Sequence, residues 1–176
     1  MTDTRAFEAA VLPCLDAAYN LARWLLRDST AAEDAVQESA LRALRYFHAL
    51  RGSDARPWFL GIVRNTCYTQ LERHRSLAES SIADDDELDR LRSDAGQAEP
   101  DPAQIYDRGN ERRRVDAALR ALPPAMREVI VLRELEGLEY AEIAHVASIP
   151  IGTVMSRLSR ARSRLKALLT QAGVGE

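Results

Sequence analysis

The sequence predicts an all-α protein made of two small helical domains joined by a flexible acidic linker. Apolar residues recur at steps of three and four along nearly every patterned segment, which is the period of an amphipathic helix. This pattern stops between about residues 79 and 110, where proline, glycine and dense negative charge are typical of a segment that cannot order itself alone. A chain of 176 residues can bury a core on each side of that break. We therefore expect domains at residues 5–78 and 111–172.

Three helices are expected in the first domain. The first stops near residues 27–29, and Thr30 and Glu33 then match a capping box, in which each side chain satisfies a free backbone donor. The second helix runs from there to Gly52, a usual kind of terminator, and the third covers about residues 57–74. Because the connections are short, the three helices can close on one core.

The second domain is expected to hold four helices and to end in a helix-turn-helix. Ile143 and Ala147 lie on one face of a short helix, residues 148–150 break it with a proline, and a second helix follows at once. Residues 151–169 carry five basic residues and no acidic one. A basic run alone would suit a solvated helix equally well, but a turn followed by such a helix is typical of DNA-binding proteins. The side of this helix that faces the core is formed by Val154, Leu158, Ala161, Leu165 and Leu168.

Composition excludes several other classes of protein. The net charge of -3 argues against a protein that coats nucleic acid in general. Acidic residues are concentrated at 84–101, which contains eight acidic and two basic residues. Cys14 and Cys67 are too few and too far apart for a disulfide framework or a zinc site, so we expect two buried thiols in a reducing cytosol. The chain has no apolar run of membrane-spanning length and no signal-peptide pattern, and its histidines lack metal spacing. We expect a cytoplasmic protein with no membrane insertion, metal or cofactor.

Three segments, taken in order, resemble parts of one bacterial protein family. The part that docks on core RNA polymerase is matched by AAEDAVQESALRAL. The part that recognises and opens the minus-10 element is matched by RPWFLGIVRNTCYTQLERHR. The fourth conserved region is matched by LPPAMREVIVLRELEGLEYAEIAHVASIPIGTVMSRLSRARSRL. That family is the extracytoplasmic-function group of RNA polymerase sigma factors. The resemblance implies a promoter-specificity subunit without catalytic activity, which binds core RNA polymerase and promoter DNA. It also implies an anti-sigma factor that holds the chain inactive.

The second predicted helix carries the residues that the resemblance assigns to polymerase docking. Their spacing of three and four places them along one side of the helix. Without the resemblance, a solvated helix face would be the better explanation for them. The residues are Asp34, Gln37, Glu38 and Leu41.

The third predicted helix and the loop before it are assigned to the minus-10 strand. Positive charge, an amide and an aromatic ring suit a single strand whose bases leave the stack. Trp58 also fits a place in the core, and the loop 48–56 corresponds to the one that takes up a flipped base in the family. The assigned residues are Leu50, Arg51, Trp58, Arg64, Asn65, Arg73 and Arg75.

The second domain is assigned to the minus-35 duplex. The helix after the turn would contact base edges, and its free backbone amides can meet a phosphate. Met155 departs from the family pattern, which often has Arg or Lys there, so a bidentate contact to guanine is lost. The reading residues are Gly152, Thr153, Met155, Ser156, Ser159 and Arg160, with backbone support from Arg133 and Tyr140.

Two functions from other classes were weighed against this one. A stand-alone helix-turn-helix regulator with an N-terminal sensor or dimerisation domain leaves the polar face at 34–41 and the basic third helix unexplained. A small hydrolase would need a Cys/His pair, and Cys67 and His74 are about 10 Å apart on one helix. The acidic linker fits passage through the basic channels of polymerase, and it fits a solubilising tether equally well.

Overall fold

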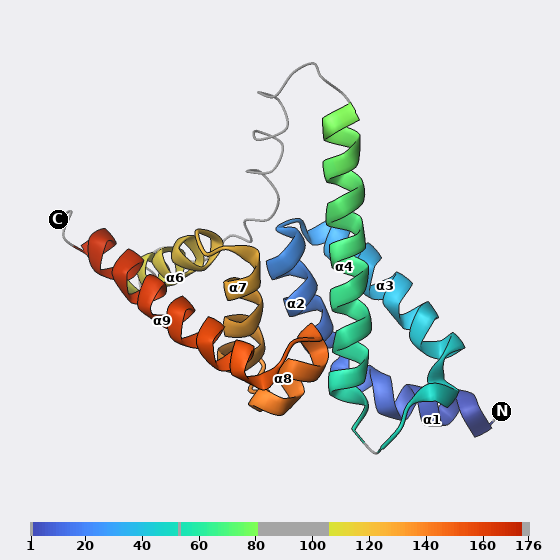
Figure 1. Ribbon diagram of the computed structural model, residues 1–176. Coiled ribbons are helices and arrows are strands. Elements are labelled where there is room, and N and C mark those ends of the chain that lie inside the picture. Colours follow the sequence, from blue (N-terminus) through green and yellow to red (C-terminus); the bar gives the residue numbers. More distant parts are fainter. Residues whose placement is uncertain (1, 53, 81–105, 174–176) are drawn as a thin grey trace.

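The computed structural model describes residues 2–52, 54–80 and 106–173, and all of the regular structure in these ranges is helical. The first group contains α1 (Thr2–Val11), the short turn η1 (Leu12–Cys14), α2 (Leu15–Leu26), α3 (Ser29–Arg45), the short turn η2 (Phe47–Ala49) and α4 (Ala55–Ser80). The second contains α6 (Tyr106–Arg120), α7 (Pro124–Ile130), the π-helical turn η3 (Val131–Leu135), α8 (Tyr140–Ala147) and α9 (Ile151–Gly173). Figure 1 shows the two groups side by side. The all-α fold with two helical domains is confirmed.

The predicted linker falls mostly outside the described residues. Residues 81–105 are not described, whereas residues 79–80 continue α4 and residues 106–110 begin α6. Helix α4 therefore runs past the predicted end near residue 74, because its glutamate, arginine, leucine and alanine residues favour a helix and no stop signal interrupts them.

The predicted capping box at Thr30 and Glu33 is wrong. Helix α2 ends at Arg27, whose φ of 61° is left-handed, and the extended Asp28 then caps α3 by accepting a hydrogen bond of 2.7 Å from the Ala31 amide. The cap lies two residues earlier than predicted because the turn between the helices is this short. A capping box does occur at the start of α8, between Glu139 and Glu142.

Two further helix predictions need correction. Helix α3 ends at Arg45, and η2 and an irregular loop follow before Gly52, whose φ of 101° lies in the left-handed region. Helix α1 was not predicted, since most of its side chains are exposed and its pattern is weak. It is anchored by Phe7, which packs edge-to-face on Phe47 with 5.5 Å between the ring centres.

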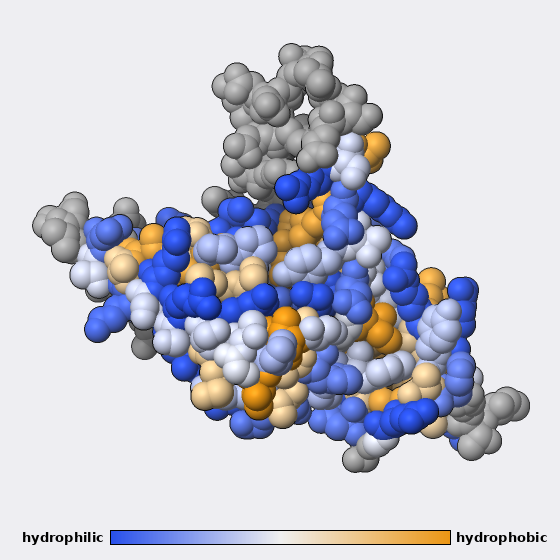
Figure 2. Space-filling view, in the orientation of Figure 1, coloured by the Kyte–Doolittle hydropathy of each residue, from blue (hydrophilic) through white to orange (hydrophobic). Residues whose placement is uncertain are grey.

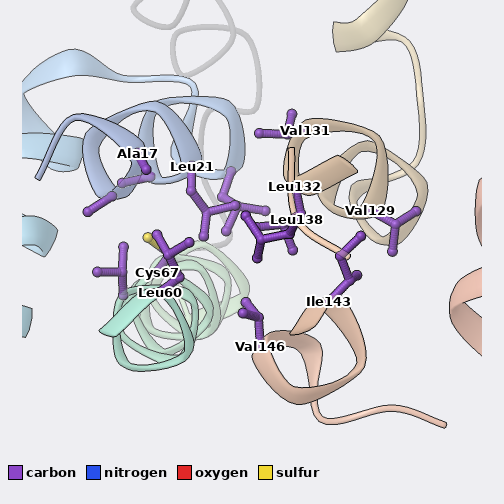
Figure 3. Close-up of a cluster of buried hydrophobic side chains, with 14 of the residues drawn as sticks. Ala17, Leu21, Leu60, Cys67, Val129, Val131, Leu132, Leu138, Ile143 and Val146 are labelled. Atoms are coloured by element: carbon purple, nitrogen blue, oxygen red, sulfur yellow. The ribbon is translucent and has the colours of Figure 1, made fainter. Parts of the chain in front are cut away.

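The two helical groups share one continuous core, although the sequence suggested a separate core for each. Leu21 of α2 and Leu60 of α4 lie in the same buried cluster as Leu132, Leu138 and Val146 of the second group (Figure 3). Each large apolar side chain removed from water in this way contributes about 1.5–3 kcal/mol. The contact between the groups is therefore a packed interface that stabilises their present arrangement.

Candidate nucleic-acid interface

The helix-turn-helix forms as predicted. Helix α8 ends at Ser148, which adopts a left-handed φ of 53°, and Pro150 precedes the first turn of α9. Val154, Leu158 and Ala161 are fully buried on the inner side of α9, so the opposite side of the helix is directed outward.

The outer side of α9 brings together the residues predicted to read the minus-35 duplex. Met155 is 54% exposed, and Gly152, Ser159 and Arg160 are also exposed. Figure 2 shows mainly hydrophilic surface over α9, with hydrophobic surface near the place where α8 and α9 meet. Arg160 makes long hydrogen bonds of 3.4 Å to the hydroxyl and carbonyl of Ser156 on its own helix. These exposed groups are free to contact the edges of base pairs.

Arg133 and Tyr140 support the helix-turn-helix from within. The Arg133 guanidinium lies 5.1 Å from the centre of the Tyr140 ring, donates a 2.8 Å hydrogen bond to the Leu138 carbonyl and forms an ion pair of 3.3 Å with Glu139. Arg133 therefore fixes the loop that leads into α8. The contact between these two side chains was not predicted from sequence.

Arg162 has a partner that the sequence did not reveal. Its Nε and one terminal nitrogen donate hydrogen bonds of 3.1 and 2.7 Å to Glu134 on η3. Hydrogen bonds to Glu134 and Tyr140 raise the pKa of Arg162. This ion pair ties α9 to η3.

The predicted polymerase-docking face lies on the outside of α3. Asp34 and Gln37 are exposed, Leu41 is 68% exposed, and Glu38 is paired with Arg42 one turn further along the helix. Leu44, which was not predicted, is 47% exposed and lies one turn beyond Leu41. The face thus combines negative charge with an exposed apolar end.

The predicted minus-10 residues fall into different environments. Asn65 and Arg73 are exposed on α4, and Arg51 is exposed in the loop before it. Trp58 is half-buried and packs against Phe47, with 6.3 Å between the ring centres, in agreement with its expected contribution to the core. The two remaining residues outside the interface are the half-buried Leu50 and the exposed Arg75, which has interactions of its own.

Arg64 is held by the second domain. Its Nε donates a 2.5 Å hydrogen bond to Glu128 of α7, and its guanidinium stacks 4.2 Å from the centre of the Tyr68 ring. The Tyr68 hydroxyl also donates to Glu128, at 3.3 Å. Burial opposes the charge on Arg64, but the bond to Glu128 outweighs it and raises the Arg64 pKa, while burial and Glu128 raise the pKa of Tyr68 to about 12. The Nε of Arg64 is thus engaged by Glu128, while its Nη1 donates a 3.4 Å hydrogen bond to the Asn65 side-chain oxygen.

Further polar contacts cross between the domains. Arg127 donates to the Trp24 carbonyl of α2 at 3.0 Å and uses its other nitrogens on carbonyls of its own domain. Glu136 accepts a 3.2 Å hydrogen bond from Asn20 and pairs with Arg56 at 3.2 Å. Sequence reasoning missed all of these contacts because their partners are distant along the chain.

Some structural features bear on other classes of function. Cys14 and Cys67 are buried free thiols, as predicted, and burial raises the pKa of Cys67 to about 12. Among the described residues, no group of three or more His, Cys, Asp or Glu side chains could hold a metal ion. Within residues 2–52, 54–80 and 106–173, no helix is long and apolar enough to cross a membrane.

Comparison with protein-family models matches both helical domains. Residues 11–77 match sigma-70 region 2, and residues 112–165 match sigma-70 region 4. The RNA polymerase sigma-H factor of Pseudomonas aeruginosa is 32% identical over 169 residues, which cover 93% of this chain and 86% of that protein. The chain belongs to the sigma-70 family. It falls in the extracytoplasmic-function group, since the sigma-E factor of Escherichia coli is 34% identical over 75% of this chain and 70% of its own length.

Other relatives and solved structures agree with this assignment. The extracytoplasmic-function sigma factor SigE of Mycolicibacterium smegmatis is 31% identical over 89% of this chain, which spans only 58% of that longer relative. The sigma factor RpoE of Bartonella quintana, solved with the anti-sigma factor NepR, aligns with a TM-score of 0.72 and 29% identity over 93% of this chain and 96% of that one. CnrH, solved with the cytosolic domain of CnrY, aligns with a TM-score of 0.65 and 26% identity over 96% and 90% of the two chains. Sigma factors bind core RNA polymerase and direct promoter-specific transcription initiation, and nothing in these comparisons supports a stand-alone regulator.

Proposed function

We propose that this sigma factor uses three separate surfaces in transcription initiation. The outer side of α9 reads the minus-35 duplex, α4 and the loop before it capture the opened minus-10 strand, and the outer side of α3 docks on core RNA polymerase. The observation that carries the proposal is the outward side of α9, where Met155, Ser156, Ser159 and Arg160 lie away from the core of the helix-turn-helix. No catalytic step of its own is part of this function.

The minus-35 contact is proposed to combine base reading with positioning. Arg160 and Met155 are exposed on the first turns of α9 that follow the helix start, which is the part of a recognition helix that reaches base edges. Arg133 and Tyr140 would contribute mainly by fixing the loop before α8, because their side chains already contact each other. Thr153 is half-buried beside the exposed Gly152, where the helix start can accept a phosphate.

The minus-10 contact requires a change in the arrangement of the domains. Arg51, Asn65 and Arg73 are already exposed, whereas Arg64 is paired with Glu128. A strand phosphate can replace Glu128 only if α7 moves away from α4. We therefore place minus-10 capture after the separation of the two domains.

The domain limits and the partners of the chain complete the proposal. Residues 5–78 would bind polymerase and the minus-10 strand, residues 79–110 would connect the domains, and residues 111–172 would bind the minus-35 duplex. An anti-sigma factor is proposed as a partner, because two similar sigma factors were solved with NepR and with the cytosolic domain of CnrY. Transcription takes place on cytoplasmic DNA, so we place the chain in the cytoplasm.

The direct test is transcription in vitro with purified core polymerase and a library of upstream fragments. The chain should select a set of promoters with shared minus-35 and minus-10 elements, and core polymerase alone should not. An Asp34→Arg/Glu38→Arg variant, which changes only the docking face, serves as the inactive control. Tight, specific binding of the free chain as a dimer to a palindromic duplex, without transcription from any fragment, would replace this function with that of a regulator.

A further inference from the structure

One polar contact between the two domains centres on a buried carboxylate. The Glu128 side chain is fully buried, and its hydrogen bonds come from Arg64 and Tyr68, which both belong to α4 of the other domain. A buried carboxylate is costly unless it is paired and hydrogen-bonded, so Glu128 depends on α4 for its partners. We call Arg64, Tyr68 and Glu128 the latch.

Near the latch, the backbones of α4 and α8 approach each other closely. An added Cβ at Gly61 of α4 would lie 3.9 Å from both the Cα and the carbonyl oxygen of Val146 on α8, so the two helices approach closely at this glycine. Val146 is itself buried, and Figure 3 shows it among apolar side chains of both domains. A single Cβ fits at this distance, but a longer side chain would meet α8.

The latch occupies a residue that the proposed function assigns to the minus-10 strand. The Arg64 side chain is only 19% exposed, and its guanidinium is shared between a carboxylate and an aromatic ring. Both interactions use the groups with which an arginine would bind a phosphate or stack on a base. Closing the latch therefore competes with strand binding for the Nε of Arg64 and for the face of its guanidinium that stacks on Tyr68.

We propose that Glu128 is an autoinhibitory residue, which acts as an internal substitute for the DNA phosphate and keeps the free chain closed on Arg64. This proposal rests on the function proposed above, in that it takes Arg64 as a ligand of the minus-10 strand. Docking of α3 on core polymerase selects the open arrangement and releases Arg64. The chain alone thereby has little affinity for single strands until it joins polymerase.

The fraction of free chains in the closed form sets how much the affinity for a single strand is lowered. If about nine-tenths of the free chain is closed, a ligand of the open form binds about tenfold more weakly than its intrinsic affinity. Any substitution that opens the chain without touching Arg64 should recover that factor. The gain should vanish in the presence of polymerase, which has already opened the chain.

Two kinds of variant open the chain by different means. Glu128→Lys places a cation against Arg64 in the closed form, so that like charges oppose closing. Gly61→Gln inserts a longer side chain between α4 and α8, and Gly61→Ala is its matched control, since a Cβ alone fits there. Circular dichroism would first establish that each variant keeps the helical content of the parent chain.

Two measurements on the full chain follow. Energy transfer between dyes on Glu8→Cys and Gln171→Cys, both exposed positions, reports the separation of the domains. Fluorescence anisotropy with a labelled single strand, taken from the minus-10 element of a transcribed promoter, reports binding without polymerase. Glu128→Lys and Gly61→Gln should lower energy transfer and tighten strand binding about tenfold, while Gly61→Ala should match the parent chain.

The outcomes separate this proposal from the function on which it rests. A free parent chain whose energy transfer already equals that of the polymerase-bound chain would overturn the latch, and so would opened variants with unchanged strand affinity. In both cases, promoter-dependent transcription by the parent chain with core polymerase would leave the proposed function standing. Loss of that transcription would instead remove the function itself.

Discussion

The two candidate DNA-binding faces differ in what covers them. On α9 the reading residues Met155, Ser159 and Arg160 are exposed, and Arg160 bonds only to its own helix among the interactions described. On α4 the corresponding cation, Arg64, is held by Glu128 and Tyr68. The two arginines carry the same charge but differ in exposure. Arg160 is exposed because it lies outside the interface between the domains, whereas Arg64 lies within that interface.

This difference bears on the order of events at a promoter. In the proposed function, a duplex can reach the outer side of α9 while the domains are closed, but a single strand binds after the domains separate. The interface is apolar at its centre, with Leu60 and Leu138 both buried, so separation costs free energy that polymerase must supply. The proposal therefore couples single-strand capture, but not duplex contact, to assembly with polymerase.

The largest expected effect concerns docking on core polymerase, which precedes capture of the minus-10 strand in the proposed function. Reversing charge with Asp34→Arg and Glu38→Arg should abolish co-purification with core polymerase, because both residues lie on the outside of α3. The melting temperature should change little, since exposed helix positions tolerate substitution. Glu8→Arg, a charge reversal at an exposed position of α1 and so away from the predicted face, is the control. Retention of polymerase affinity in the double variant would return these residues to an ordinary solvated face.

Alanine at the two contrasted arginines should have different consequences. Arg160→Ala should cost roughly 1–3 kcal/mol in promoter binding and relax the preference at one minus-35 position, because a base contact is lost. Arg64→Ala should lower open-complex formation and leave the minus-35 preference unchanged. Selection of promoters from a randomised pool, followed by permanganate footprinting of melted DNA, measures both effects. Identical changes in the two variants would remove the distinction between the faces.

Adding a base contact is the converse of removing one. Met155→Arg should shift the minus-35 preference toward guanine at one position, since arginine can form two hydrogen bonds with guanine in the major groove. A discrimination of about 1–3 kcal/mol is expected for a good bidentate pair. The measurement is sequencing of upstream elements selected by the variant and by the parent chain. An unchanged preference would mean that this side of α9 does not lie in the major groove.

The smallest effect tests the covered face through pH. The pKa of Tyr68 is raised from 10.0 to about 12 by burial and by Glu128, so the unfolded chain loses this proton before the folded chain does. The contribution of Tyr68 to the free energy of unfolding is therefore complete below pH 10.0 and is lost as the pH rises toward about 12. Tyr68→Phe should make the stability less sensitive in this window, although Cys67 retains part of the slope. Urea unfolding at several alkaline pH values would measure the difference, and equal slopes would argue that Tyr68 is solvated.

The sequence predicted the helices and the helix-turn-helix well because their signals are local. Val154, Leu158 and Ala161 recur at helical steps and are all buried. The interface between the domains could not be predicted in this way. Glu128 lies 64 residues from Arg64 in the chain, and a polar pair such as Arg127 and Glu128 ordinarily indicates an exposed position.

The same reasoning explains the errors at individual elements. The cap of α3 was misplaced because Asp28 and Thr30 are both good capping residues, and only the left-handed Arg27 decides between them. The site predictions on α9 needed only the helix period, so their placement on one outer side follows from sequence. The role of Arg64 depends on its surroundings, which only the folded chain defines.

Chemical modification of arginine in the free chain tests the contrast between the two faces most directly. The chain would be treated briefly with phenylglyoxal, and the modified residues would be located by mass spectrometry, with and without core polymerase. We expect Arg160 to react readily in the free chain and Arg64 to be protected, since Arg160 is exposed and the Arg64 side chain is only 19% exposed and paired with Glu128. Polymerase without DNA should raise the reactivity of Arg64. Equal reactivity of Arg64 and Arg160 in the free chain would contradict the account.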